Sequence, residues 1–402
     1  MGAWWQERAR LARYMADLLQ GELARSRRSA DGLPPGPWPE SFRLDAELGA
    51  DSLERMALAT SLSEAIQLHR SGVEDALLAR RRLGDWLDTA AAGLALHDGE
   101  ITFRSSGSIG MPRSFTHRLD DLCQEVEALA DRFGTVRRIV RVVPCHHIYG
   151  FIFTVLLPER LGLAESRVID ARSASPASVA QRAQPGDLVV GWPGFWRDFA
   201  GVRHLPAGVA GVTSTAPCPE EVAHDVIASG VSPFLQVYGA SETAGIAWRT
   251  EPLQPFELMP HWRRAGGWLV RERPDGSTLS MRPPDDLEWR GPRHFKVLGR
   301  RDGAVQVGGV NVSLAQVRNV LLGHPAVCDA VVRPMSPSEG DRLKAFIVPA
   351  ATEADLARLE RALRAWIDEH LEPPQRPKAL QFGTSLPTTA AGKPADWRLD
   401  PA

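Results

Sequence analysis

Between residues 103 and 113 the chain reads Phe103-Arg104-Ser105-Ser106-Gly107-Ser108-Ile109-Gly110-Met111-Pro112-Arg113. This segment follows a predicted short strand, Glu100–Phe103, and precedes a predicted helix. Hydroxyl and glycine residues at this density allow backbone N–H and side-chain O–H groups to surround a polyphosphate. The segment lacks the Gly-Lys-Ser/Thr ending of a P-loop nucleotide hydrolase. It is therefore either a phosphate-binding loop of another kind or a Ser/Gly hairpin.

The composition is that of a globular protein large enough for two or three domains. Of the 402 residues, 44% are hydrophobic and 24% charged, and the formal net charge of −2 gives no basic field for nucleic acid. The four cysteines lie far apart, so no disulfide framework is predicted and a cytoplasmic location is expected. The sequence shows no signal-peptide pattern and no apolar run of the ~18 residues that a membrane span needs.

The basic residues are almost all arginine. Lysine and arginine together number 47, and four of them are lysine: Lys296, Lys344, Lys378 and Lys393. Most positions that need only a positive charge are therefore arginine. Because a compact ammonium and a planar guanidinium are not interchangeable, the four lysines are expected at positions that require lysine itself.

The first part of the chain is predicted to be helical. Apolar residues at helical spacing predict a helix over Trp5–Arg28, followed by a Gly/Pro-rich turn. A second helix is predicted over Ser52–His69, with Asp51 or Ser52 as its cap, and a third over Val73–Ala91.

From Ile101 onward, short apolar runs alternate with helical stretches, which predicts an α/β core with a mostly parallel sheet. Between about residues 252 and 297 the pattern favours antiparallel strands. The rest of the chain, with predicted helices Leu314–Leu322 and Glu353–Leu371, reads as a small α+β domain. We therefore predict a helical region at 1–95, an α/β core at 96–300 and an α+β domain at 301–402.

The segment at 103–113 resembles the phosphate loop of the adenylate-forming superfamily, which includes acyl-CoA synthetases, peptide-synthetase adenylation domains and luciferase-type enzymes. That loop ends in Gly-x-Pro-Lys and is followed by Thr-His, and residues 110–113 with Thr116-His117 fit it. Ile109 replaces a hydroxyl residue and Arg113 replaces the lysine. The resemblance implies nucleotide-binding roles for Ser105, Ser106, Gly107, Ser108, Gly110 and Arg113.

Three further segments follow in the order of that family. Residues 144–150 resemble the segment that lines the acid pocket, where His147 is the matching residue; the pair His146-His147 also allows a metal site or a buried structural histidine. Residues 214–217 resemble the loop beside the adenine and the acyl group, which implies roles for Ser214, Thr215 and Ala216. Residues 238–242 resemble Tyr-Gly-x-Thr-Glu. That likeness implies nucleotide contacts from Tyr238, Gly239, Ala240 and Ser241, and Mg²⁺ binding by Glu242.

The remaining likenesses concern the ribose, the hinge and the end of the chain. Asp285 precedes Arg300 at the spacing of the family's ribose-binding Asp and its hinge Arg, with Asp286 as the rival; Asp302 falls at the hinge position. Residues 308–312 resemble the thiol-tunnel loop, although Gln306 stands where a lysine is common. Residues 387–393 resemble the terminal Pro-x-Thr-x-x-Gly-Lys, whose lysine stabilises charge during adenylation, a role implied for Lys393.

The resemblance implies a shortened adenylate-forming ligase core with a small α+β C-terminal domain and a helical N-terminal region. It implies ATP- and Mg²⁺-dependent activation of a carboxylic acid as an acyl-adenylate, with Glu242, Lys393 and His147 at the reaction. The thiol acceptor would be the phosphopantetheine of an acyl carrier protein or free CoA. No nucleic-acid or membrane partner is expected.

Two finer likenesses complete the sequence reading. Asp51-Ser52-Leu53 and the helices around it look like an acyl carrier protein, in which Ser52 would bear phosphopantetheine; the alternative is a helical scaffold with an ordinary capping residue. The shortened core looks like hydroxybenzoate ligases of xanthomonadin and aryl-polyene pigment pathways. Alternatives of another class are a non-catalytic carrier-interaction scaffold and a nucleotide-binding regulator.

Overall fold

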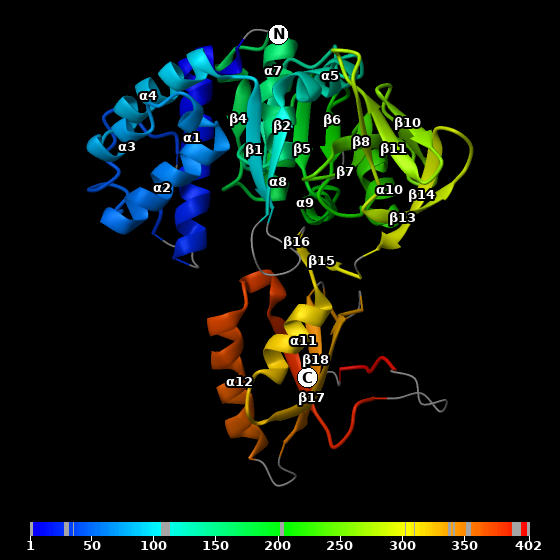
Figure 1. Ribbon diagram of the computed structural model, residues 1–402. Helices are drawn as coiled ribbons and strands as arrows, with labels where there is room; N and C mark the ends of the chain where they lie inside the picture. Colours follow the sequence, from blue (N-terminus) through cyan, green and yellow to red (C-terminus); the bar gives the residue numbers. More distant parts are fainter. Residues whose placement is uncertain are drawn as a thin grey trace. The chain divides into compact units, whose positions relative to one another are not determined.

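The computed structural model describes residues 3–27, 32–34, 36–105, 113–201, 205–301, 303–308, 310–336, 339–340, 342–350, 355–387 and 395–399. They belong to two compact units (Figure 1). The first unit contains the described residues of 1–105, 114–283 and 287–296. The second contains Arg113, residues 284–286 and the described residues from 297 onward. No helix among the described residues is long and apolar enough to cross a membrane.

The N-terminal region is helical, as predicted. It consists of a 3₁₀ turn (Trp4–Gln6), α1 (Arg8–Ser26), α2 (Ser52–Ala65), a second 3₁₀ turn (Leu68–Arg70), α3 (Asp75–Ala79) and α4 (Leu83–Leu96). Helix α2 begins with a capping box: the Asp51 side chain accepts from the Glu54 N–H, and the Glu54 side chain accepts from the Asp51 N–H. Asp51, and not Ser52, is therefore the cap.

The predicted single helix over residues 73–91 is wrong, because the chain is extended between α3 and α4. Arg80 and Arg82 both have extended backbone angles. The N–H of Leu83 donates to the oxygen of Phe42 at 2.9 Å, and the Arg81 oxygen accepts from the Leu44 N–H at 2.9 Å. Backbone groups that would continue the helix instead pair with an upstream segment.

The first unit is organised around an open sheet that has nine strands in the described part of the chain. In spatial order they are β13 (Asp285–Trp289), β14 (His294–Arg300), β9 (Phe256–Leu258), β8 (Ala244–Arg249), β7 (Phe234–Ala240), β6 (Ala210–Thr213), β5 (Asp187–Gly191), β3 (Arg138–Arg141) and β4 (Val168–Asp170). Strands β3 to β7 are mutually parallel, and β8, β9 and β14 pair antiparallel. The predicted α/β layering is confirmed, as are the antiparallel strands that follow it.

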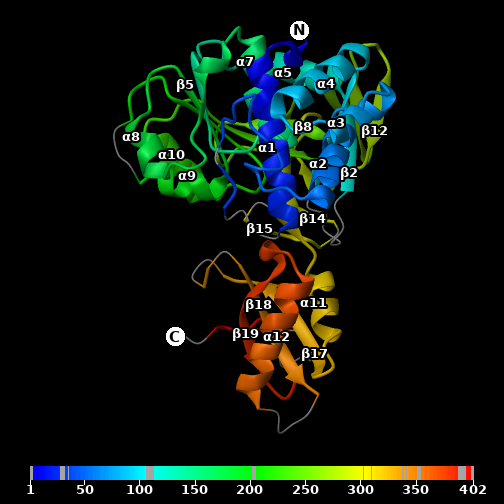
Figure 2. The same ribbon diagram turned by 90° about the vertical axis from the view of Figure 1, so that its left-hand side faces the viewer.

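Helices cover this sheet in two layers. Helices α8 (Pro176–Gln181), α9 (Pro193–Phe199) and α10 (Glu220–Ala228) pack on one face, where Phe195, Trp196 and Phe199 of α9 meet buried valines of the strands (Figure 2). The remaining helices of the core are α5 (Leu119–Ala130), α6 (Ile148–Phe151), a π-helical turn (Ile152–Leu156) and α7 (Leu157–Arg160). A small antiparallel sheet of β10 (Trp262–Ala265), β11 (Trp268–Glu272) and β12 (Thr278–Met281) adds to the unit.

The second unit is a small α+β fold, as predicted. It has a hairpin of β15 (Val305–Val307) and β16 (Val310–Val312), followed by a sheet of β17 (Val327–Pro334), β18 (Leu343–Pro349) and β19 (Pro377–Phe382). Helices α11 (Leu314–Leu322) and α12 (Leu356–His370) supply Val317, Leu321, Leu359, Leu363 and Ile367 to its core. The bounds of α11 are those predicted from the sequence.

A buried ion-pair network joins helix α1 to the sheet. Arg141 of β3 and Asp17 of α1, each with 2% of its side chain exposed, form an ion pair. Arg172 reaches the other Asp17 oxygen at 2.8 Å, and Arg141 also binds Asp170 at 2.5 Å. Burial alone would raise the pKa of Asp17, but the charges of Arg141 and Arg172 hold that pKa well below its ordinary value.

We expect Asp17→Asn to lower the free energy of unfolding of the first unit by about 3 kcal/mol or more, because two arginines would lose a buried counter-charge. Chemical denaturation followed by circular dichroism measures this loss. Asp88→Asn is the control, since Asp88 pairs with Arg8 with 69% of its side chain exposed and should contribute about 1 kcal/mol or less. Equal losses from the two substitutions would contradict the structural role of Asp17.

Candidate active site

Two of the predicted nucleotide-binding segments meet at the carboxyl ends of neighbouring parallel strands. Residues Ser214, Thr215 and Ala216 directly follow β6, and Tyr238 lies in β7 beside it. The Ser214 hydroxyl donates to the Val237 oxygen at 3.0 Å, which joins the two segments. Thr215 is exposed and has a φ of 75°, a strained conformation for a β-branched residue. This edge of a parallel sheet is where α/β proteins bind ligands.

The Tyr238–Ala240 segment is packed closely against its neighbours. The Tyr238 ring is half-buried and lies edge-to-face on Phe295, with ring centres 5.3 Å apart. A Cβ at Gly239 would come within 2.2 Å of the Ala244 oxygen, so only glycine fits there. Packing therefore requires glycine at position 239.

The turn that carries Glu242 is tightly held by its own residues. Thr243 Oγ1 accepts from the Ala240 N–H at 2.9 Å and donates to the Ala244 oxygen at 2.8 Å. Ala244 adopts a φ of 58° to complete the turn. Ser241 is half-buried and Glu242 is exposed. The turn therefore presents the Glu242 carboxylate to solvent from a fixed backbone.

Two side chains, the half-buried His117 and the buried Glu125, hold this turn from outside. His117 donates from Nε2 to the Ser241 oxygen at 2.7 Å, and Glu125 of α5 accepts from the Gly245 N–H at 2.9 Å. Burial lowers the pKa of His117, so its ring is neutral near pH 7 and Nε2 carries the donated proton. Burial raises the pKa of Glu125 to about 7 against the opposing effects of Arg271 and the Gly245 N–H.

The predicted phosphate loop joins two paired strands. Ser105 ends β1 (Glu100–Ser105) and Arg113 begins β2 (Arg113–Arg118), and the predicted helix follows β2 as α5. The hydroxyls of Thr102 and Thr116 lie 2.9 Å apart and link these strands. Outside the described residues lie the predicted loop residues Ser106, Gly107, Ser108 and Gly110, together with Ile109.

The predicted acid-pocket segment follows β3. His147 is exposed at the start of α6, whereas His146 packs against α1 so closely that a Cβ at Gly21 would lie 2.7 Å from its ring. The Tyr149 hydroxyl lies 2.9 Å from the oxygens of both Gly191 and Val212, at the ends of β5 and β6. The segment is thereby fixed to the same sheet edge as residues 214–216.

The predicted ribose and hinge residues lie at the ends of β13 and β14. Asp285 is buried with Arg300 Nε at 3.9 Å from its carboxylate. Asp286 is exposed and pairs with Arg301 at 2.8 Å. Gln306 of β15 faces Asn311 of β16 across the hairpin. Asp302 and Lys393 lie outside the described residues.

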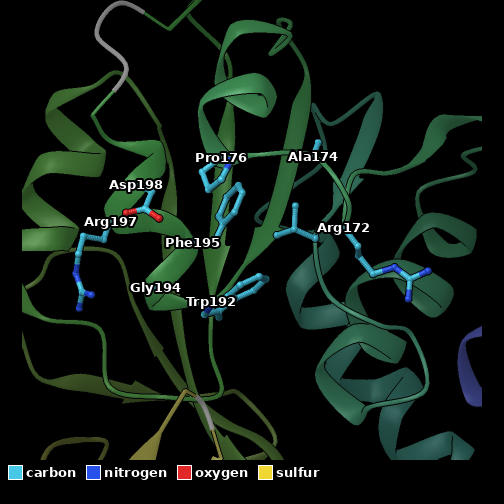
Figure 3. Close-up of a pocket in the computed structure, with 9 residues that line it drawn as sticks. Arg172, Ala174, Pro176, Trp192, Gly194, Phe195, Arg197 and Asp198 are labelled. Atoms are coloured by element: carbon cyan, nitrogen blue, oxygen red, sulfur yellow. The ribbon is translucent and has the colours of Figure 1, made fainter. Parts of the chain in front are cut away.

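A cavity that the sequence does not reveal opens where the strand order reverses. The chain runs from β3 to β4 on one side and from β5 through β6 to β7 on the other, so β3 and β5 flank the reversal. A cavity of about 410 Å³ lies there (Figure 3), and both apolar and charged residues line it: Val142, Ala174, Pro176, Trp192, Gly194 and Phe195, with Arg172, Arg197 and Asp198. Arg172 is already paired with Asp17 and Asp170, so its charge is balanced within the fold.

Comparison with known proteins gives the chain a family. Residues 316–393 match the AMP-binding enzyme C-terminal domain. A 4-coumarate–CoA ligase of Halorhodospira halophila is 40% identical over 385 residues, which cover 95% of this chain and 97% of that protein. One of Rhodobacter capsulatus is 37% identical over 395 residues, covering 96% and 99%. The chain belongs to the adenylate-forming acid–thiol ligases.

Solved structures of this ligase fold agree with that of the chain. The o-succinylbenzoate CoA synthetase of Bacillus subtilis superposes with a TM-score of 0.61 at 15% identity, covering 98% of this chain and 97% of that one. The amide bond synthetase of Marinactinospora thermotolerans gives a TM-score of 0.59 at 18% identity, covering 95% and 92%. At such identities the likeness concerns the fold alone.

Acid–thiol ligases of this family use ATP and Mg²⁺. The residues of this chain fit the ion: within the described part, no hydrogen bond or ion pair engages the exposed carboxylate of Glu242. Magnesium is commonly held by one or two carboxylates together with substrate phosphates. Accordingly, the described residues contain no cluster of three or more His, Cys, Asp or Glu that could hold a metal by itself.

Sequence reasoning missed the residues that hold the Glu242 turn. Thr116-His117 was noted as part of a motif, but its contact with Ser241 joins residues 124 positions apart. Glu125 lies on the inner face of an amphipathic helix, where an acidic residue is unusual. That burial was the available signal, since Glu125 falls among Leu122, Val126 and Leu129 in the sequence.

The raised pKa of Glu125 predicts a pH-dependent stability. Its folded value of about 7 exceeds the ordinary 4.5, so its contribution is favourable at low pH and is lost as pH rises through about 7. Glu125→Gln removes this titration and keeps an oxygen for Gly245. We expect the unfolding free energy of the variant, relative to wild type, to increase by up to about 3 kcal/mol from about pH 5 to about pH 8.

Denaturation curves at a series of pH values measure that difference. Glu127→Gln is the matched control on the same helix, because 49% of its side chain is exposed. A flat difference curve for Glu125→Gln would contradict the burial argument.

Proposed function

We propose that the chain is an aryl-CoA ligase, which activates a hydroxycinnamate-like aromatic acid with ATP and transfers the acyl group to CoA. The observation that carries the proposal is the likeness, over nearly its whole length, to relatives named 4-coumarate–CoA ligase. In the first step a carboxylate oxygen attacks the α-phosphorus and the bond to pyrophosphate breaks. In the second, the thiol attacks the acyl carbon, loses its proton and displaces AMP.

Each step needs charges brought together and stabilised, which the proposed residues supply. Ser105, Ser106, Gly107, Ser108, Gly110 and Arg113 would surround the phosphates of ATP, whereas Tyr238, Ser214 and their neighbours would line the adenine. Asp285 would bind the ribose, a role that its burial beside Arg300 favours over the exposed Asp286. Glu242 would hold Mg²⁺, and Lys393 would stand between the carboxylate and the α-phosphate.

Transfer to a carrier protein, with a hydroxybenzoate-like acid, is the second candidate. The observation that favours it is Ser52, which is exposed at the first residue of α2, as a phosphopantetheine-bearing serine must be. If Ser52 is modified, intact mass will increase after incubation with CoA and a phosphopantetheinyl transferase. An unchanged mass would leave α2 as a capped structural helix.

A panel of acids tests the proposed function. We expect ATP–pyrophosphate exchange with 4-coumarate to exceed that with 4-hydroxybenzoate and with decanoate by about tenfold or more. A single methylene too many or too few in an apolar pocket already changes the binding free energy of a substrate by about 1–3 kcal/mol. Thioester formation should then proceed with free CoA and not with a holo-carrier protein. A preference for decanoate, or for the carrier, would contradict the proposal, and no exchange with any acid would favour a non-catalytic scaffold.

Lys393→Ala tests the proposed charge-stabilising lysine. We expect adenylate formation to fall by about 100-fold or more, because one preorganised charge at the reacting centre is removed, while ATP affinity stays nearly unchanged. Exchange kinetics and calorimetric ATP binding measure the two effects. Lys378→Ala is the matched control, since Lys378 is exposed on β19. Equal activity of the two variants would exclude the role of Lys393.

A further inference from the structure

Lys344, one of the four lysines of this arginine-rich chain, is buried in the C-terminal unit. Lys344 lies in β18 and is 1% exposed. A buried ammonium is costly unless its three donors are all used. Lys344 Nζ lies 2.9 Å from Glu339 Oε2 and 3.3 Å from Asp396 Oδ1, and it also donates to the backbone oxygen of Trp397. Two of these three partners belong to the segment near the end of the chain.

The Trp397 side chain completes this contact. Its ring lies over Lys344, with the ammonium 5.1 Å from the ring centre, and meets Phe346 of the same strand edge-to-face at 5.6 Å. A cation over an indole face is attracted by the ring quadrupole, more strongly where water is excluded. Trp397 is 9% exposed, so residues 396–397 are bound to β18 by both backbone and side chain.

Glu339 extends the contact by two residues. It accepts from the Leu399 N–H at 2.8 Å and from the Ser336 N–H at 2.9 Å, in addition to pairing with Lys344. The Leu399 bond, followed by that from Lys344, lowers the pKa of Glu339 to about 2. Glu339 therefore stays ionised, and it joins the segment at 396–399 to the loop before β18. We call Lys344, Glu339, Asp396 and Trp397 the terminal clasp.

The clasp fixes one flank of the segment that contains Lys393. The other flank follows β19, which pairs with β18 in parallel register, with Ala379 beside Lys344. The Ala395 N–H donates to the Pro387 oxygen at 2.9 Å, which brings the two flanks together. Lys393 is two residues from Ala395 in the sequence. Pro387 and Ala395, the described residues on either side of 388–394, are thus joined by a hydrogen bond.

We propose that Lys344 is a positioning residue for adenylate formation: through the terminal clasp it holds Asp396 and Trp397, which follow Lys393 by three and four residues in the sequence. The inference rests on the proposed function, and on Lys393 acting in its first step. It also explains a lysine among 43 arginines (47 − 4). Three acceptors around one point suit a compact ammonium with three donors, whereas a planar guanidinium presents its donors in a fork.

Lys344→Met tests the proposal through the two half-reactions. Met keeps the apolar stem and removes the donors. We expect ATP–pyrophosphate exchange to fall by about 10- to 100-fold, since a misplaced charge-stabilising group loses much of its effect. The conversion of supplied aryl-adenylate and CoA to thioester should stay within about twofold of wild type, because that step does not use Lys393 in this proposal.

Trp397→Ala is the second variant, because it weakens the clasp from the terminal segment and leaves β18 and its buried lysine intact. It should lower exchange in the same direction and also spare the thioester step. Lys378→Ala, on the exposed side of β19, is the control and should leave both half-reactions unchanged. Circular dichroism and thermal melting of each variant establish that the C-terminal unit is folded.

The outcomes separate this inference from the proposed function. Equal losses in both half-reactions, or no loss in either, for folded Lys344→Met and Trp397→Ala would overturn the positioning role. Loss of exchange alone in both variants would support it. Wild-type protein that gives no exchange with any acid would instead refute the proposed function itself, and the positioning role with it.

Discussion

The structure of the first unit depends on an ion-pair network in which Arg141 and Arg172 share the carboxylate of Asp17 beside a hydrophobic sheet. Arg141 is 1% exposed at the end of β3, and it is acceptable there because Asp17 and Asp170 supply carboxylates from either side. Removing one partner from such a pair leaves a buried charge that the interior cannot solvate. Helix α1 is therefore required by the sheet, and the helical region shares one compact unit with the α/β core.

The same helix reaches the segment that precedes α6. Asp17 also accepts from the Cys145 N–H at 2.8 Å, and His146 packs on Gly21 one turn further along α1. Tyr149 then ties the segment to the ends of β5 and β6. One ion-pair network thus fixes the loop that carries His147 relative to the sheet edge where Ser214 and Tyr238 lie. Long-range polar contacts thus connect α1, the loop before α6 and the edge of the sheet.

The Glu242 turn and residues 396–399 are each held in place by polar side chains from other elements. His117 and Glu125 hold the turn that carries the exposed Glu242, and Lys344 and Glu339 hold residues 396–399, which follow Lys393 in the sequence. Electrostatic catalysis needs charges that are already in place before the reaction, since reorganising them would cost part of the stabilisation. The hydrogen bonds from His117 and to Glu125 would supply that preorganisation to Glu242 in the proposed reaction.

From the sequence one could predict the helical region, the α/β core and the α+β domain in their order along the chain, and the resemblance to the family. Helix 314–322 could be predicted to the residue, because amphipathic periodicity is a local property. The motifs from Ser105 to Lys393 could be found in order, because their spacing along the chain is itself the signal. Their resemblance to the motifs of the family implied ATP and Mg²⁺.

Tertiary structure alone decided which side chains meet. It breaks the predicted helix at Arg80–Arg82, because the backbone there pairs with residues 42–44. It brings His117 to Ser241, and Lys344 to Trp397, across 124 and 53 residues of chain. It also opens the cavity between β3 and β5, which exists because the strand order reverses there. Such contacts depend on how the strands are ordered in space, and no local pattern of residues records that order.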